Sequence, residues 1–167
     1  MIPALDTIHI LRSLGYEGSA YLGHDPDVDG VYISLRDTPS SGSNPKWARD
    51  FMRIQIRSKA NRLDYVSGYE ELDKVKNLLF GVHTVTLEEV DTNQGKAVRI
   101  DGTIYQNTQE ITATVNEVIR TVDYIRYLIA SDIQFITLDE NNRPIHTLNL
   151  EVVRDHLDPI GNRLPIN

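Results

Sequence analysis

A strand–loop–strand–helix order in the first half of the chain constrains its fold most strongly. Residues 31–35 and 51–57 each alternate apolar and polar side chains, which is the pattern of a half-buried strand. In the second stretch the polar positions are Arg53, Gln55 and Arg57, so one face should be buried and the other wet or interfacial. This arrangement is typical of a small α+β domain.

Two helices are predicted on either side of these strands. Residues 4–14 carry apolar side chains at near-helical spacing, with a proline suited to the first turn. Ser67 and Glu70 have the spacing of a capping box for a second helix, and Gly81 suits its end. The apolar stripe of that helix should consist of Leu72, Val75 and Leu79.

The second half of the chain predicts two hairpins and one further element. Residues 84–90 and 97–105 flank one turn-prone polar stretch, and residues 133–138 and 147–153 flank another. Between the hairpins, residues 114–130 have apolar side chains at helical intervals after a capping-box pattern. We expect a helix there. A strand is the alternative, because β-branched residues lower helix propensity.

Length and element order together predict one domain. The chain has 167 residues, within the range of ~100–200 residues that single domains commonly span. We expect an α+β fold over residues 1–153, with a mostly antiparallel sheet of about five or six strands and two or three helices. A flexible loop near residues 38–49 and an extended C-terminal tail over residues 154–167 should complete it.

Charge, cysteine content and missing motifs argue against several functional classes. Without cysteine the chain has no disulfides, thiolate metal sites or thiol nucleophiles. A formal net charge of −7 argues against a dedicated nucleic-acid binder. No apolar run approaches ~18 residues, so no membrane partner is expected. Neither a nucleophile elbow nor a phosphate-binding glycine loop occurs, so we expect neither catalysis nor a cofactor.

Asp25, Asp27 and Asp29 have the spacing of metal ligands. Aspartates at alternate positions before a glycine copy the opening of an EF-hand calcium loop. The twelfth position is Arg36, where a bidentate glutamate should complete the coordination shell. A calcium- or metal-binding module is therefore an alternative function. Because His24 lies beside these aspartates, a small hydrolase is a second alternative. A polar turn explains the same residues, so we expect no metal.

The features of residues 31–81, taken in order, resemble the bacteriophage minor capsid and tail-terminator family. They are the Asp37-Thr38 turn after a strand, a polar loop, the strand with Gln55-Ile56-Arg57, and a helix that ends in Leu78-Leu79-Phe80-Gly81. Residues 139–143 followed by 148–152 are similar to the last hairpin of that family. The long helix expected over 114–130 and the acidic stretch 15–30 depart from its pattern. Because of those departures, a stopper or tail-completion protein of the same junction is an alternative role.

The resemblance implies a structural virion protein of the phage head–tail interface and not an enzyme. A tail terminator would form a homo-oligomeric ring, expected to be a hexamer, that caps the tail tube and docks the filled head. The implied partners are the tail tube protein and head–tail connector proteins, with DNA only as passing cargo. The implied location is the tail or neck of the virion, after assembly in the host cytoplasm. The expected subunit contacts are Trp47, Arg53, Gln55 and Arg57.

Overall fold

The structure is a computed structural model that describes residues 1–44 and 48–157. This part of the chain forms two helices, α1 (Pro3–Ser13) and α2 (Tyr65–Phe80), and nine strands. The strands are β1 (Ser19–Leu22), β2 (Tyr32–Asn44), β3 (Arg49–Lys59), β4 (Val85–Thr92), β5 (Gly95–Ile100), β6 (Thr103–Gln106), β7 (Gln109–Ile111), β8 (Val115–Leu138) and β9 (Pro144–His156).

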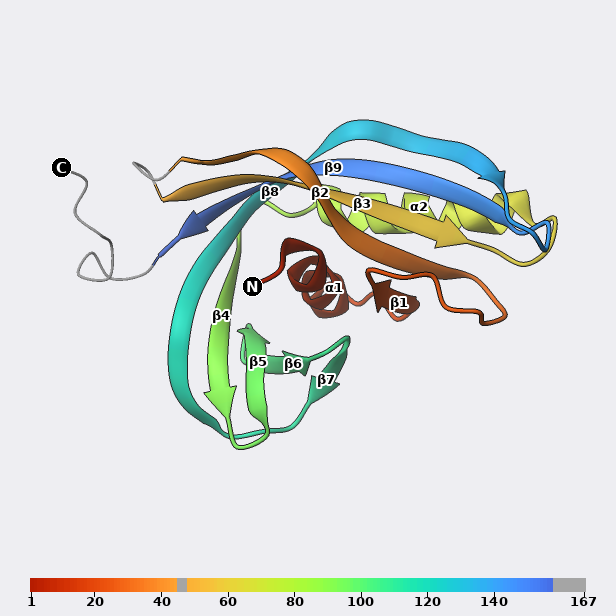
Figure 1. The fold of residues 1–167 in the computed structure, drawn as a ribbon. Helices are drawn as coiled ribbons and strands as arrows, with labels where there is room; N and C mark the ends of the chain where they lie inside the picture. The colour runs from red at the N-terminus through yellow and green to blue at the C-terminus, as the bar shows by residue number, and fades with distance from the viewer. Residues whose placement is uncertain (45–47, 158–167) are drawn as a thin grey trace.

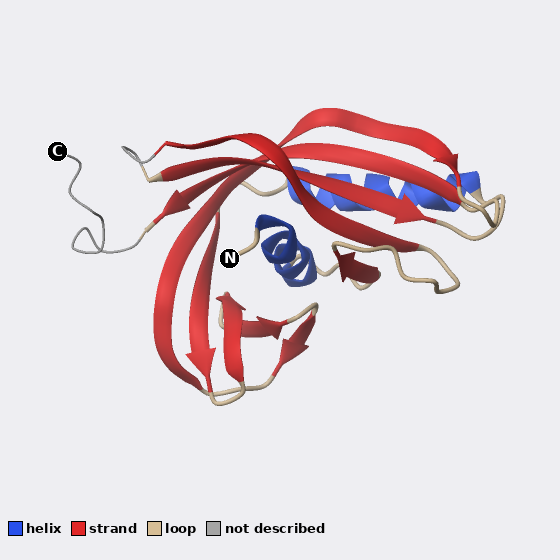
Figure 2. Ribbon diagram, viewed as in Figure 1, coloured by secondary structure: helices blue, strands red, loops and turns tan. Residues whose placement is uncertain are grey.

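All nine strands belong to one curled sheet, in the order β1-β2-β3-β9-β8-β4-β5-β6-β7. β1 pairs with β2 in parallel, and every other pair is antiparallel. The sheet bends along β8 and β4 so that β5, β6 and β7 pass below α1, and the whole forms a half-barrel around that helix (Figure 1). α2 lies along the same inner side, under β3 and β9 (Figure 2).

The predicted fold class is wrong in its sheet. The described residues do not form the predicted sheet of about five or six strands. They form a nine-stranded mixed sheet and two helices.

The largest single error concerns residues 114–130, which were expected to be helical and instead form most of β8. Four register shifts interrupt the pairing of β8 with β9, and two more interrupt its pairing with β4. Each irregularity displaces the alternation of the side chains, so apolar residues recur at intervals that imitate a helix. The β-branched residues of this stretch then favour the strand.

The two predicted hairpins are present with different bounds. β4 and β5 form the first one, but the expected strand 97–105 is divided by a turn at Asp101 and Gly102, whose φ angles are 48° and 81°. Positive φ at both positions is what a two-residue hairpin turn requires. β8 and β9 form the last hairpin. β9 continues to His156, so residues 154–156 of the expected tail belong to the sheet, while residues 158–167 lie outside the described part.

α1 forms as predicted, and α2 forms with a different N-terminal cap. The Asp64 side chain, not that of Ser67, caps α2, and its Oδ1 accepts a hydrogen bond from the Ser67 backbone amide over 3.2 Å. Gly81 has φ −74°, so it is not the left-handed residue that often follows a helix. The predicted stripe of Leu72, Val75 and Leu79 is buried in the core between α1, α2 and the inner face of the sheet.

Candidate functional site

The predicted contact residues of β3 lie together on the outer face of the sheet, away from the helices. Ile54 and Ile56 between them are fully buried on the inner face. Arg53 forms an ion pair of 2.8 Å with Glu151, and Gln55 Nε2 donates to Asn149 Oδ1 over 3.2 Å, both across to β9.

Arg57 completes this row and forms an ion pair of 3.0 Å with Asp25. The placement on one wet face is confirmed, whereas the role of these residues in subunit contact stays a prediction. Trp47 lies outside the described residues.

The three aspartates of the calcium-like string are not gathered into one ligand set. Asp25 accepts hydrogen bonds from Ser34 and Arg57. Its partial burial acts to raise its pKa, but these bonds outweigh the burial and the pKa lies below its usual value. Asp27 and Asp29 line a separate polar pocket beside Arg143. Across residues 1–44 and 48–157, no three histidine or carboxylate side chains are arranged to hold a metal ion.

His24 lies near Asp25 without the contacts that hydrolysis would require. Its Nδ1 is 3.0 Å from the backbone oxygen of Leu22. The nearby hydroxyl of Ser34 donates to Asp25 over 2.5 Å instead of to an imidazole. A nucleophile needs a base within hydrogen-bond reach, so nothing in this arrangement favours the hydrolase.

The free outer edge of β8 is the feature that sequence reasoning missed. β4 pairs with β8 only as far as Tyr124, whereas β9 pairs with its other side as far as Leu138. Within the described residues no strand covers the outer side of residues 126–138, and Figure 1 shows this part of β8 as the rim of the sheet. Five large apolar side chains of this edge are 37–51% exposed: Leu128, Ile129, Phe135, Ile136 and Leu138.

An exposed aromatic patch adjoins that edge and is formed by Tyr65, Tyr69 and Phe135 around His146. The ring centroids of Tyr65 and His146 are 4.5 Å apart and nearly perpendicular, and Phe135 lies 5.4 Å from Tyr65. His146 is fully buried, and neither ring nitrogen has a hydrogen-bond partner. Burial lowers the pKa of His146, which favours the neutral form of the ring beneath these aromatic side chains.

A second open edge lies on the opposite side of the same layer. β1 pairs with β2 only over Tyr32–Leu35, so in the described residues the outer side of β2 has no neighbouring strand from Arg36 onward. This edge is polar, contains Pro39, and has a register irregularity between Thr38 and Gly42. The layer β2-β3-β9-β8 is thus bounded by one polar and one apolar edge.

A buried polar cluster fixes α1 against the sheet. Tyr124 donates to Asp6 Oδ2, and Arg154 lies 3.7 Å from the same carboxylate. Arg154 also forms an ion pair of 2.7 Å with Asp50, which has His156 at 2.7 Å as well. Burial raises the pKa of Asp6 to about 6, although the bond from Tyr124 opposes this effect. These groups connect α1, β3, β8 and β9, so their role in the fold is structural.

Comparison with known proteins found no family model and no curated protein that match this chain. No helix among the described residues is long and apolar enough to span a bilayer. The function has to be inferred from the residues and their geometry.

Proposed function

We propose that this chain is a structural subunit of the phage head–tail junction, of the tail-terminator kind, that assembles into a closed ring of identical copies. The observation that carries the proposal is the open, apolar edge of β8 over residues 126–138. Unpaired backbone groups along a strand edge can bind another strand, and proteins that remain monomeric usually blunt such edges with charges, proline or short length. Over residues 126–138 β8 keeps a long edge with exposed apolar side chains and no proline, although it also carries Arg126, Asp132 and three register shifts.

The occupant of this edge is a second copy of the chain. β2 and β8 bound the same four-strand layer, and three successive antiparallel pairings make them run in opposite directions. Copies rotated about an axis along the strands keep their strand directions, so β8 of one copy meets β2 of the next in antiparallel orientation. Such a contact joins two different surfaces, and a ring results when the rotation closes.

The resemblance supports the phage assignment. Its matching segments, residues 31–81 and 139–152, correspond to β2, β3, α2 and most of β9, which are three of the four strands of this layer and the helix below it. The wet outer face with Arg53, Gln55 and Arg57 remains available for tail tube or connector proteins. A stopper or tail-completion protein is the alternative role at the same junction.

Light scattering on the purified protein, with and without tail tubes, tests the proposal. A ring mass in either condition is the expected result. Ile136→Lys should weaken assembly at least about tenfold, equivalent to about 1.4 kcal/mol, because burying an unpaired charge in a contact costs more than that. Val28→Lys is the matched control, since Val28 is 39% exposed against 51% for Ile136 but belongs to the loop before β2 and to neither open edge. A protein that stays monomeric at every concentration and does not bind tail tubes would contradict the proposal.

A further inference from the structure

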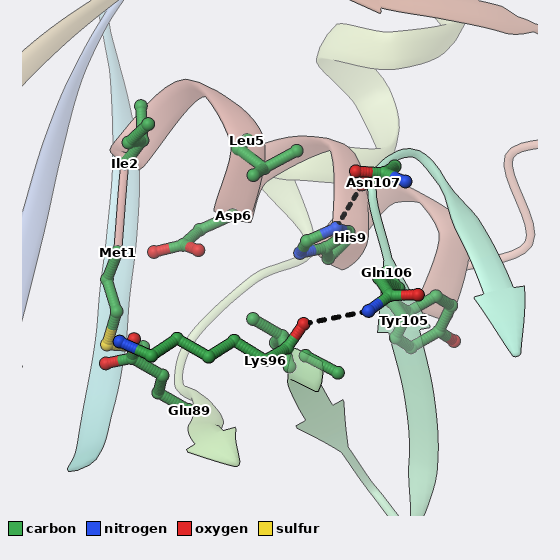
Figure 3. A pocket seen from close by; sticks show the side chains of 12 residues that line it. Met1, Ile2, Leu5, Asp6, His9, Glu89, Lys96, Tyr105, Gln106 and Asn107 are labelled. Carbon is green, nitrogen blue, oxygen red and sulfur yellow. Dashed lines mark hydrogen bonds between the residues drawn. The ribbon is translucent and has the colours of Figure 1, made fainter. Parts of the chain in front are cut away.

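A pocket of about 420 Å³ lies between α1 and the small strands β5 and β6 (Figure 3). Its walls combine an apolar surface from Ile2, Leu5 and Val98 with a few polar groups. This composition and size resemble those of small-ligand sites, in which few polar groups orient a mostly apolar ligand. Nothing in the proposed assembly uses this pocket.

His9 presents an unused hydrogen-bond acceptor to the pocket. Its Nε2 lies 2.5 Å from the backbone oxygen of Asn107, which can only accept, so Nε2 carries the proton. Burial lowers the pKa of His9, although the bond to Asn107 opposes this, and the ring is therefore neutral. Its Nδ1 is then a bare acceptor, and it has no hydrogen-bond partner although the side chain is only 2% exposed. Figure 3 shows this nitrogen turned toward the pocket, on the side of Asp6.

The other polar groups on the pocket wall are mainly acceptors too. The Asp6 carboxylate is buried at its inner end, and Glu89 contributes a second carboxylate from β4. Gln106 already donates its amide to the backbone oxygens of Gln94 and Lys96. The pocket wall also carries two cations. The α-ammonium group of Met1 acts to lower the pKa of Asp6, and in Figure 3 the Lys96 side chain stretches across the pocket toward Glu89.

We propose that this pocket binds an organic cation, an ammonium or guanidinium group carried on a short apolar stem. The cation would donate hydrogen bonds to His9 Nδ1 and to the carboxylate of Glu89, and its stem would lie against Ile2, Leu5 and Val98. Asp6, which already accepts a hydrogen bond from Tyr124, would contribute only its charge behind these groups. Charge-assisted hydrogen bonds of this kind are stronger than neutral ones. Because the Lys96 side chain extends toward Glu89, the ligand has to compete with it for that carboxylate. The group can come from a free amine or from a basic side chain of another protein.

Titration with butylguanidinium, followed by the ¹⁵N chemical shift of His9 Nδ1, tests the site directly. We expect saturable binding with an upfield shift of Nδ1, whereas butyrate and butanol should cause neither. Glu89→Gln should weaken binding and Lys96→Gln should strengthen it, each by roughly two- to fivefold, which is what one partly exposed ion pair contributes. Both positions are outside the buried core, so the variants should fold.

A blocked Gly-Arg-Gly tripeptide distinguishes the two sources of the cation. Tighter binding of the tripeptide than of butylguanidinium points to a side chain from another protein, and weaker binding points to a free amine. Either result supports the site if Nδ1 shifts. An unchanged Nδ1 resonance, equal binding of butyrate, or equal affinities of the native, Glu89→Gln and Lys96→Gln proteins would overturn it.

Discussion

Tyr124 donates a hydrogen bond of 2.5 Å to Asp6, and this bond joins two residues that lie 118 positions apart in the chain. It connects the first helix to the middle of the longest strand, at the point where the sheet begins to curl. Arg154 approaches both groups, at 3.3 Å from the tyrosine oxygen and 3.7 Å from the carboxylate. This contact is one of several that hold α1 inside the half-barrel.

The free energy of unfolding of the Asp6→Asn variant should increase relative to that of the native chain as the pH rises. Burial raises the pKa of Asp6 from 3.8 to about 6. A carboxyl group with a raised folded-state pKa contributes its full stability below its unfolded pKa and loses it as the pH rises through the folded pKa. The free energy of unfolding of the native chain should therefore fall relative to that of the variant between about pH 4 and pH 7, by up to about 3 kcal/mol.

Urea unfolding of both proteins at several pH values within this window measures that difference. His9 and His146 are common to both proteins, so their contributions cancel in the comparison. A difference that does not change with pH, or that shrinks as the pH rises, would contradict the environment described for Asp6.

Tyr124→Phe should destabilise the protein more than Tyr127→Phe does. The first variant removes a donor to a buried carboxylate, which costs about 1–3 kcal/mol when the acceptor stays buried. Tyr127 is the matched control because its ring is stacked with that of Tyr124, while its hydroxyl meets only the neutral hydroxyl of Thr7, at 2.9 Å. Loss of the Tyr127 hydroxyl should lower the free energy of unfolding by about 0.5–1.5 kcal/mol. Thermal or urea unfolding checks the order, and equal losses would show that the carboxylate does not depend on Tyr124.

Gly68→Ala should destabilise α2, although alanine is normally the better helix former. A Cβ atom at Gly68 would lie 3.0 Å from His146 Nδ1, and Tyr65 and Phe135 pack against that ring. Overpacking of this kind typically costs about 1–3 kcal/mol.

Gly81→Ala is the control, since the nearest atom to its Cβ would be 3.5 Å away and its φ is negative. It should leave the free energy of unfolding within about 0.5 kcal/mol of the native value. If Gly68→Ala changes the free energy of unfolding as little as this control does, the His146 ring is free to move.

The sequence predicted local features well where one periodicity runs without interruption. α1, the buried stripe of α2 and the alternation of β3 follow directly from the spacing of their apolar residues. β8 could not be recognised in this way, because its register shifts destroy the two-residue period on which strand prediction depends. The N-terminal cap of α2 was misplaced by one turn, because Asp64 and Ser67 are both good capping residues.

The candidate sites depend on contacts that no local pattern contains. His9 meets Asn107 across 98 residues, and the acceptor in the pocket follows only from that pairing. The open edge of β8 likewise depends on where β4 stops pairing, which is set by the curl of the whole sheet. Only the wet face of β3 could be read in advance, because alternation within one strand is enough to define it.

Crosslinking across the two open edges is the most direct test of the central claim, since the chain contains no cysteine. Cysteines are placed at Ile136 on β8 and at Ser40 on β2, and the protein is treated with a bismaleimide. The double variant should give a ladder of oligomers that ends at one closed ring, and each single variant should give at most a small amount of dimer. Efficient dimers from Ile136→Cys alone would show that β8 meets its own copy, and the absence of any ladder would contradict assembly through these edges.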